Sequence, residues 1–93
     1  MSTPLAVALH YDKDKRDAPR VVATGRGTIG ENIIAAAREH GVPIEENPGL
    51  AEALADVEIG DEIPVELYRA VAEVLTFILR AAASSNQPGT SNR

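Results

Sequence analysis

The sequence predicts a small α/β domain in which a three-stranded mixed sheet packs with three helices, the last of them long. Three observations support this fold class. The chain has 93 residues, of which 44% are apolar, as expected of a single globular domain. Short apolar stretches precede segments with helical periodicity. Glycine, proline and asparagine separate these segments at positions where turns and helix caps prefer them.

The strands are predicted from three short stretches. Residues 5–11, LAVALHY, form the first, and a polar loop, DKDKRDAP, follows at residues 12–19. Residues 20–24, RVVAT, form the second. Residues 42–45, VPIE, form a short third strand, with Pro43 as its first residue or on an edge, because proline cannot donate to a sheet ladder. Residues 20–45 would then make one βαβ unit.

The first helix is predicted between two glycine-containing turns. Thr28 and Glu31 fit a capping box at its start. Its apolar stripe is predicted to consist of Ile29, Ile33, Ile34 and Ala37. A glycine at position 41 ends it at the C′ position, where the backbone often turns left-handed.

The other two helices begin at prolines. Asn47 is a good N-cap and Pro48 suits the first helical position. Pro64 opens the longest helix, which we expect to reach about Ala83. The chain would therefore consist of one domain at residues 1–83 and a polar, disordered tail at residues 84–93.

A glycine motif raises the question of nucleotide binding. Gly25, Gly27 and Gly30 have the spacing G-x-G-x-x-G, and Glu45 and Glu46 follow about twenty residues later. A complete dinucleotide-binding domain does not fit in this chain, however. We interpret the glycines as a turn and as a close contact between helix and sheet, and expect no cofactor. A nucleotide-binding regulator that uses the turn from Gly25 to Gly30 is the alternative.

Composition argues against several other classes of function. A net charge of −5 and an aromatic content of 3% disfavour nucleic-acid binding. The chain has no cysteine, and His10 and His40 fall in different predicted elements, so we expect no metal site. No carboxylate stands with a histidine or serine in a recognisable arrangement, so we expect no catalytic residues. The absence of a long apolar run or signal peptide predicts a cytoplasmic protein without membrane insertion.

Three stretches resemble a known family. AVALHYDKDKRDAPRVVATGRGTIGENI, GVPIEENPGLAEAL and EIGDEIPVELYRAVAEVL are similar to the C-terminal cytoplasmic domain of the FlhB/YscU family, the switch proteins of flagellar and virulence type III export. The resemblance covers residues 6–79. It implies a small domain that is not known for nucleotide binding, which favours the turn interpretation of the glycines.

The resemblance also has departures. Members of the family that switch substrates cut themselves at Asn-Pro-Thr-His, just before the strand that begins Tyr-Ala-Val-Ala-Leu. Met1, Ser2, Thr3 and Pro4 stand there in this chain, and only Thr3 matches. We therefore expect no self-cleavage. The first strand of the family is also missing, and we expect an open sheet edge that another chain could fill by strand addition.

The family resemblance implies a shallow apolar patch on which export substrates dock, and carried over to this chain it comprises Ala18, Pro19, Ala72 and Leu75. For Ala72 and Leu75 we expect packing within the domain to be the larger role. The implied function is a non-enzymatic protein of flagellar or type III export, at the export apparatus. Its partners would be rod- or hook-type export substrates or export-gate membrane proteins, including the full-length exporter. A paralogue that serves a different complex is the alternative among binding proteins.

Overall fold

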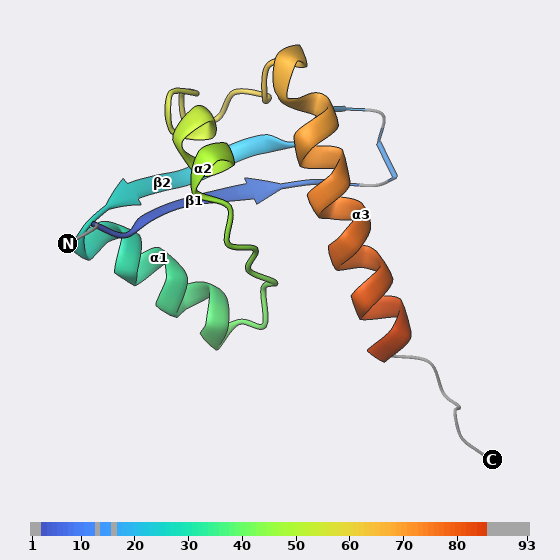
Figure 1. Ribbon diagram of the computed structural model, residues 1–93, viewed down its shortest axis with the longest axis horizontal. Coiled ribbons are helices and arrows are strands. Elements are labelled where there is room, and N and C mark those ends of the chain that lie inside the picture. Colours follow the sequence, from blue (N-terminus) through green and yellow to red (C-terminus); the bar gives the residue numbers. More distant parts are fainter. Residues whose placement is uncertain (1–2, 13, 16, 86–93) are drawn as a thin grey trace.

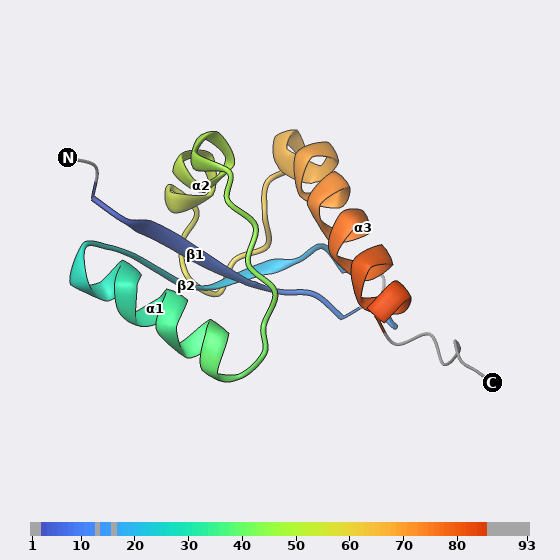
Figure 2. The same ribbon diagram turned by 60° about the horizontal axis from the view of Figure 1, so that its bottom comes forward.

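The fold is a two-stranded antiparallel sheet with helices on both faces. The computed structural model describes residues 3–12, 14–15 and 17–85. Strand β1 (Leu5–His10) pairs with β2 (Arg20–Arg26). Helix α1 (Thr28–Glu39) lies on one face of this pair, and α2 (Pro48–Ala55) and α3 (Tyr68–Ser85) lie on the other (Figures 1 and 2). The prediction of a small α/β domain with three helices and a long C-terminal helix is confirmed.

The two faces of the sheet differ in side-chain size. Leu5 pairs with Arg26 and Ala8 with Ala23, and the register shifts between Ala8 and Leu9, where β2 carries one extra residue. Because side chains alternate along a strand, the leucines and the valine of β1 share one face. The alanines of both strands share the other face with Gly25. The small residues let α1 approach the sheet closely, while the larger ones face α2.

The predicted third strand is wrong. Residues 42–45 form no strand, and among the described residues the sheet has two strands. Residues 60–63 occupy the outer edge of β2 instead: Gly60 N donates to Val21 O (2.7 Å), Val21 N to Asp61 O (3.0 Å) and Ile63 N to Pro19 O (2.9 Å). This edge segment makes a single β-bridge, between Arg20 and Glu62.

A physical reason for the missing strand lies at the end of α1. Gly41 has the left-handed backbone (φ 71°) predicted for the C′ position. The next amide, Val42 N, donates to Ala37 O (2.8 Å) and so is used to close the helix. Pro43 has no amide hydrogen to offer. The segment thus begins with two residues whose amides cannot enter a ladder, and the predicted βαβ unit does not form.

The predicted N-terminal cap is wrong for α1 and confirmed for α2. The N-cap of α1 is Gly27, not Thr28, and no side chain caps this end. The capping box was therefore wrong: Thr28 already lies inside the helix, and Gly27 O accepts from Glu31 N (2.9 Å). In α2 the prediction is confirmed, since Asn47 Oδ1 accepts from Leu50 N (3.1 Å) and Pro48 is the first residue.

The long C-terminal helix begins in two steps. After Pro64, a 3₁₀ turn, η1 (Val65–Leu67), leads directly into α3. Helix α3 continues past Ala83 to Ser85. Residues 86–93 of the expected disordered tail lie outside the described part of the chain.

The hydrophobic core lies between β2, α2 and α3. Its four buried residues come from four segments: Val21, Leu54, Ile63 and Val71. The surrounding residues are partly buried: Val7, Leu9, Ala18, Leu50, Val57, Leu67 and Leu75. With so few fully buried side chains, each contributes a large share of the stability of this small domain.

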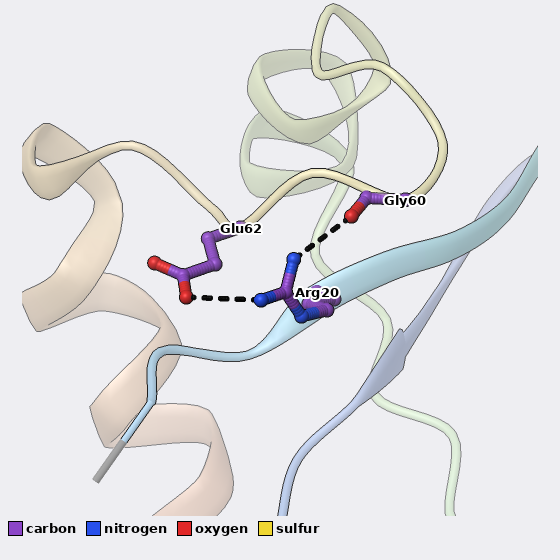
Figure 3. Close-up of polar contacts among 3 residues, drawn as sticks. All are labelled: Arg20, Gly60 and Glu62. Atoms are coloured by element: carbon purple, nitrogen blue, oxygen red, sulfur yellow. Dashed lines mark hydrogen bonds and ion pairs between the residues drawn. The ribbon is translucent and has the colours of Figure 1, made fainter.

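Two arginines of β2 connect the strand to neighbouring segments. Arg20 Nη1 donates to the carbonyl oxygen of Gly60 (3.0 Å), and Nη2 donates to Glu62 Oε2 (3.3 Å), which ties the edge segment to β2 (Figure 3). Arg26 forms a bidentate pair with Glu52 of α2 at 2.8 and 3.1 Å. Hydrogen bonding and the charge of Arg26 lower the pKa of the Glu52 carboxyl.

Truncating the core side chain of α2, Leu54, should make the domain less stable to unfolding. We expect Leu54→Ala to lower the free energy of unfolding by about 2–5 kcal/mol, because it opens a cavity in a core of four buried residues. Ile59→Ala is the control, since Ile59 is 61% exposed and its truncation should cost less than about 0.5 kcal/mol. Urea denaturation followed by circular dichroism measures both. Equal effects would contradict the location of the core.

Candidate partner-binding groove

An open groove lies between the loop that follows β1 and residues 68–79 of α3. Its volume is about 380 Å³. The four residues of the predicted patch all line it: Ala18, Pro19, Ala72 and Leu75. The structure thus brings together two pairs of residues that are far apart in the sequence. That these residues bind a partner stays a prediction.

The four patch residues differ in burial. Pro19 is buried and Ala18 half-buried, so both belong to the wall of the groove. Leu75 packs against the core, as expected. Ala72 is exposed, contrary to the expected packing role. The reason is its place on α3, about 100° around the helix from the buried Val71.

Residues missed by the sequence analysis complete the groove. Ile63 and Val71, both buried, lie at its inner side. Tyr11, Tyr68 and Leu79 also line it and are 40–48% exposed. Asp17 and Thr76 add polar groups. The spacing of residues 68, 72, 75 and 79 along one side of a helix was a usable signal, but the position of Tyr11 opposite them depends on the fold.

The chemistry of the groove suits a protein ligand better than a charged small molecule. Its lining is mostly aliphatic, and both tyrosines of the chain contribute to it. Tyrosine offers apolar contact area together with a hydroxyl for hydrogen bonding, a combination enriched at protein interfaces. Among the residues that the structure describes, Asp17 is the one charged residue of the lining. Such a surface can accept an apolar side chain from a peptide or a helix.

The glycine turn is explained by packing. A β-carbon added to Gly30 would lie 2.7 Å from Pro4 O and 2.8 Å from Gly25 O, and one added to Gly25 would lie 2.8 Å from Ile29 Cβ. Gly27 has a left-handed backbone (φ 63°), and its amide donates to Pro4 O (2.8 Å). The glycines therefore let α1 begin against the sheet, and nothing in this arrangement favours the nucleotide-binding alternative.

The two histidines are separate. His10 ends β1 and His40 follows α1, and both are exposed. Within the described ranges, no group of three or more His, Asp or Glu side chains is arranged to hold a metal ion.

Comparison with known proteins identifies the family. Residues 2–78 match the FlhB HrpN YscU SpaS Family. The chain belongs to this family. The shared domain is a structural switch domain of type III and flagellar protein export rather than a classical enzyme.

Individual relatives agree with this assignment. The chain is 49% identical over 80 residues to the uncharacterized protein YlqH of Bacillus subtilis strain 168, covering 84% of this chain and 86% of that protein. It is 51% identical over 77 residues to the flagellar biosynthetic protein FlhB of Salmonella typhimurium, covering 82% of this chain and 20% of FlhB. The FlhB-like chain thus spans about a fifth of the FlhB sequences that it matches.

Solved structures share the fold. The cytoplasmic domain of FlhB from Shewanella putrefaciens superposes with a TM-score of 0.76 at 36% identity, covering 81% of this chain and 63% of that one. The PscU C-terminal domain gives a TM-score of 0.76 at 28% identity, covering 81% and 96%. No helix in the described part of this chain is long and apolar enough to cross a bilayer.

A pair of Gly→Ala variants tests the packing role of the glycine turn. Gly30→Ala should lower the free energy of unfolding by about 1–3 kcal/mol, because the new methyl group overlaps backbone oxygens. Gly49→Ala, in α2, should raise it by up to about 1 kcal/mol, since alanine favours a helix and the site is open. Thermal denaturation compares the two. A stable Gly30→Ala variant would overturn the packing explanation.

Proposed function

We propose that this FlhB-like chain is a non-enzymatic component or modulator of flagellar or type III protein export. In this proposal it acts in the cytoplasm, peripheral to the export apparatus. Its groove, centred on Ala18, Pro19, Ala72 and Leu75, binds rod- or hook-type export substrates or export-gate membrane proteins, including a full-length exporter. The main support is the convergence of these four residues on one open apolar groove.

The exposure of the groove supports a binding role. Tyr68, Leu79 and Tyr11 keep two-fifths or more of their surface in contact with solvent although they surround a buried floor. An apolar side chain from a partner would cover these rims and contact Val71 and Ile63 below. Burial of such a side chain contributes about 1.5–3 kcal/mol, so a short segment with one or two apolar anchors could bind.

Charge substitution at the exposed position of the groove tests this role. Ala72→Glu should weaken binding of purified rod or hook proteins at least about tenfold, because a carboxylate would have to be desolvated when the groove is filled. Fluorescence anisotropy measures the affinity. Ala72 is preferable to Pro19 or Leu75, which are buried or pack against the core, so that changing them would confound binding with folding.

Ala36→Glu provides the matched control. Ala36 is an exposed helical alanine in α1, on the opposite face of the sheet. The Ala36→Glu variant should bind the rod or hook proteins with the same affinity as the unchanged protein. Equal binding by both variants would exclude the groove. Absence of binding to all flagellar export proteins would instead favour a paralogue that serves a different complex.

We also propose that the chain does not cleave itself. Its single Asn-Pro sequence, Asn47-Pro48, starts α2. Asn47 Oδ1 accepts from Leu50 N, and its carbonyl oxygen accepts from Ala51 N (2.9 Å). Attack by the side-chain nitrogen on the carbonyl carbon of Asn47 would require the side chain to leave its capping position, which would break the contact with Leu50 N. These contacts support a structural role for Asn47.

Intact-mass spectrometry over days at neutral pH should show one uncut species for the unchanged protein and for Asn47→Ala. The same Asn47→Ala change should lower the free energy of unfolding by about 1 kcal/mol because the N-cap is lost, whereas Asn47→Asp should keep most of the stability. A fragment that ends at Asn47 and is absent from the Asn47→Ala protein would refute the proposal.

A further inference from the structure

The second half of α3 extends away from the rest of the domain. It runs past the ends of β1 and β2, and no other helix or strand of the described chain lies beside it (Figures 1 and 2). This part of the helix is nevertheless rich in apolar residues. Phe77, the only phenylalanine of the chain, is 64% exposed. An exposed phenylalanine on a projecting amphipathic helix suggests contact with another protein surface.

Phe77 belongs to a regular seam along α3, defined here as Ala70, Val74, Phe77 and Ala81. These residues recur at intervals of four, three and four, which is the spacing of a coiled-coil contact. Ala70 and Val74 are half-buried, while Phe77 and Ala81 are exposed.

The seam is separate from the partner-binding groove. Phe77 and Leu79 are two residues apart, and each helical residue turns the chain by about 100°, so they lie on nearly opposite sides of α3. Leu79 lines the groove and Phe77 does not. The helix therefore has two apolar sides that can be occupied independently.

We propose that the seam pairs with the seam of a second copy of the chain, with the two α3 helices antiparallel. A twofold axis midway between residues 75 and 76 sets Val74 opposite Phe77 of the second copy, and Ala70 opposite Ala81. Each contact then occurs twice, as an isologous interface requires. The bulky residues meet at the centre, and the alanines at both ends let the helices approach closely.

Charge complementarity supports a second copy of the chain as the partner and an antiparallel orientation of the two α3 helices. Glu73 and Arg80 flank the seam on the same side of α3. In the antiparallel pair, Glu73 lies diagonally across from Arg80 of the second copy on the same side of the interface, about 3 Å further along the helix, and the symmetry repeats the contact. In a parallel pair, Glu73 and Arg80 of the second copy would lie on the other side of the interface, so this contact could not form. Exposed ion pairs add little affinity, but they discriminate between orientations.

The contacts of Glu73 within one chain are compatible with this pairing. Its carboxylate lies 3.8 Å from Arg69 Nε, at the limit of an ion pair, and the two side chains are 73% and 93% exposed. Both can rearrange at low cost. The pair of α3 helices would leave the two grooves facing away from the interface, so pairing and partner binding do not compete.

The oligomeric state is measured by sedimentation velocity on the whole chain, between about 10 µM and about 1 mM, because a single pair of helices makes a small interface. As the concentration increases, the mass of the sedimenting species should rise from 9.8 kDa towards twice that value. Phe77→Glu should stay monomeric throughout. Leu79→Glu, the matched control on the opposite side, should pair as the unchanged protein does. A monomeric unchanged protein, or pairing by Phe77→Glu, would overturn the proposal.

Charge reversal tests the contact between Glu73 and Arg80. Glu73→Arg or Arg80→Glu alone should weaken pairing about tenfold, and the double variant should restore it. Circular dichroism would show that each variant keeps its helices. A double variant as weak as the single ones would exclude this contact.

Disulfide trapping tests the direction, because the natural chain has no cysteine. A mixture of Ala70→Cys and Ala81→Cys chains should form the mixed disulfide faster than either forms its own. Faster bonding of each variant to itself would show a parallel pair and overturn the antiparallel arrangement.

Discussion

The docking of residues 60–63 on the outer edge of β2 is the contact on which the rest of the structure depends. Three backbone hydrogen bonds and the Arg20 side chain hold this segment in place. It separates α2 from α3 in the chain, so its position fixes where both helices meet the sheet. Ile63, its last residue, is also one of the four buried core residues. Polar and apolar interactions thus act at the same point.

The same contact builds the groove. Ile63 N donates to Pro19 O, so the wall formed by the loop after β1 is connected to the floor by a hydrogen bond. Val71 packs into the core one helical turn after the start of α3 and thereby orients Tyr68, Ala72 and Leu75 toward Pro19. The groove is therefore a consequence of how the core closes, and core variants would be expected to alter it indirectly.

The two faces of the sheet serve different purposes. One carries alanines and Gly25 and receives α1 so closely that a β-carbon added to Gly30 would lie 2.7 Å from Pro4 O and 2.8 Å from Gly25 O. The other carries larger residues and builds the core with α2 and α3. Helix α3 divides its own surface in a similar way: one side packs and lines the groove, and the seam with Phe77 faces elsewhere. A short chain thus presents two distinct surfaces on one helix.

The sequence alone determined the features that depend on neighbouring residues. The N-cap at Asn47, the left-handed turn at Gly41 and the long helix after Pro64 follow from local backbone chemistry. Where two local solutions competed, sequence reasoning chose wrongly: Thr28 and Glu31 fit a capping box, but Gly27 caps the helix. Only the tertiary structure decided the sheet, because a strand needs a partner edge. Residues 42–45 have strand-forming residues without such an edge, whereas residues 60–63 have little strand propensity and gain one from β2. The groove likewise required the fold, since Tyr11 and Tyr68 line the same groove only after the core has closed.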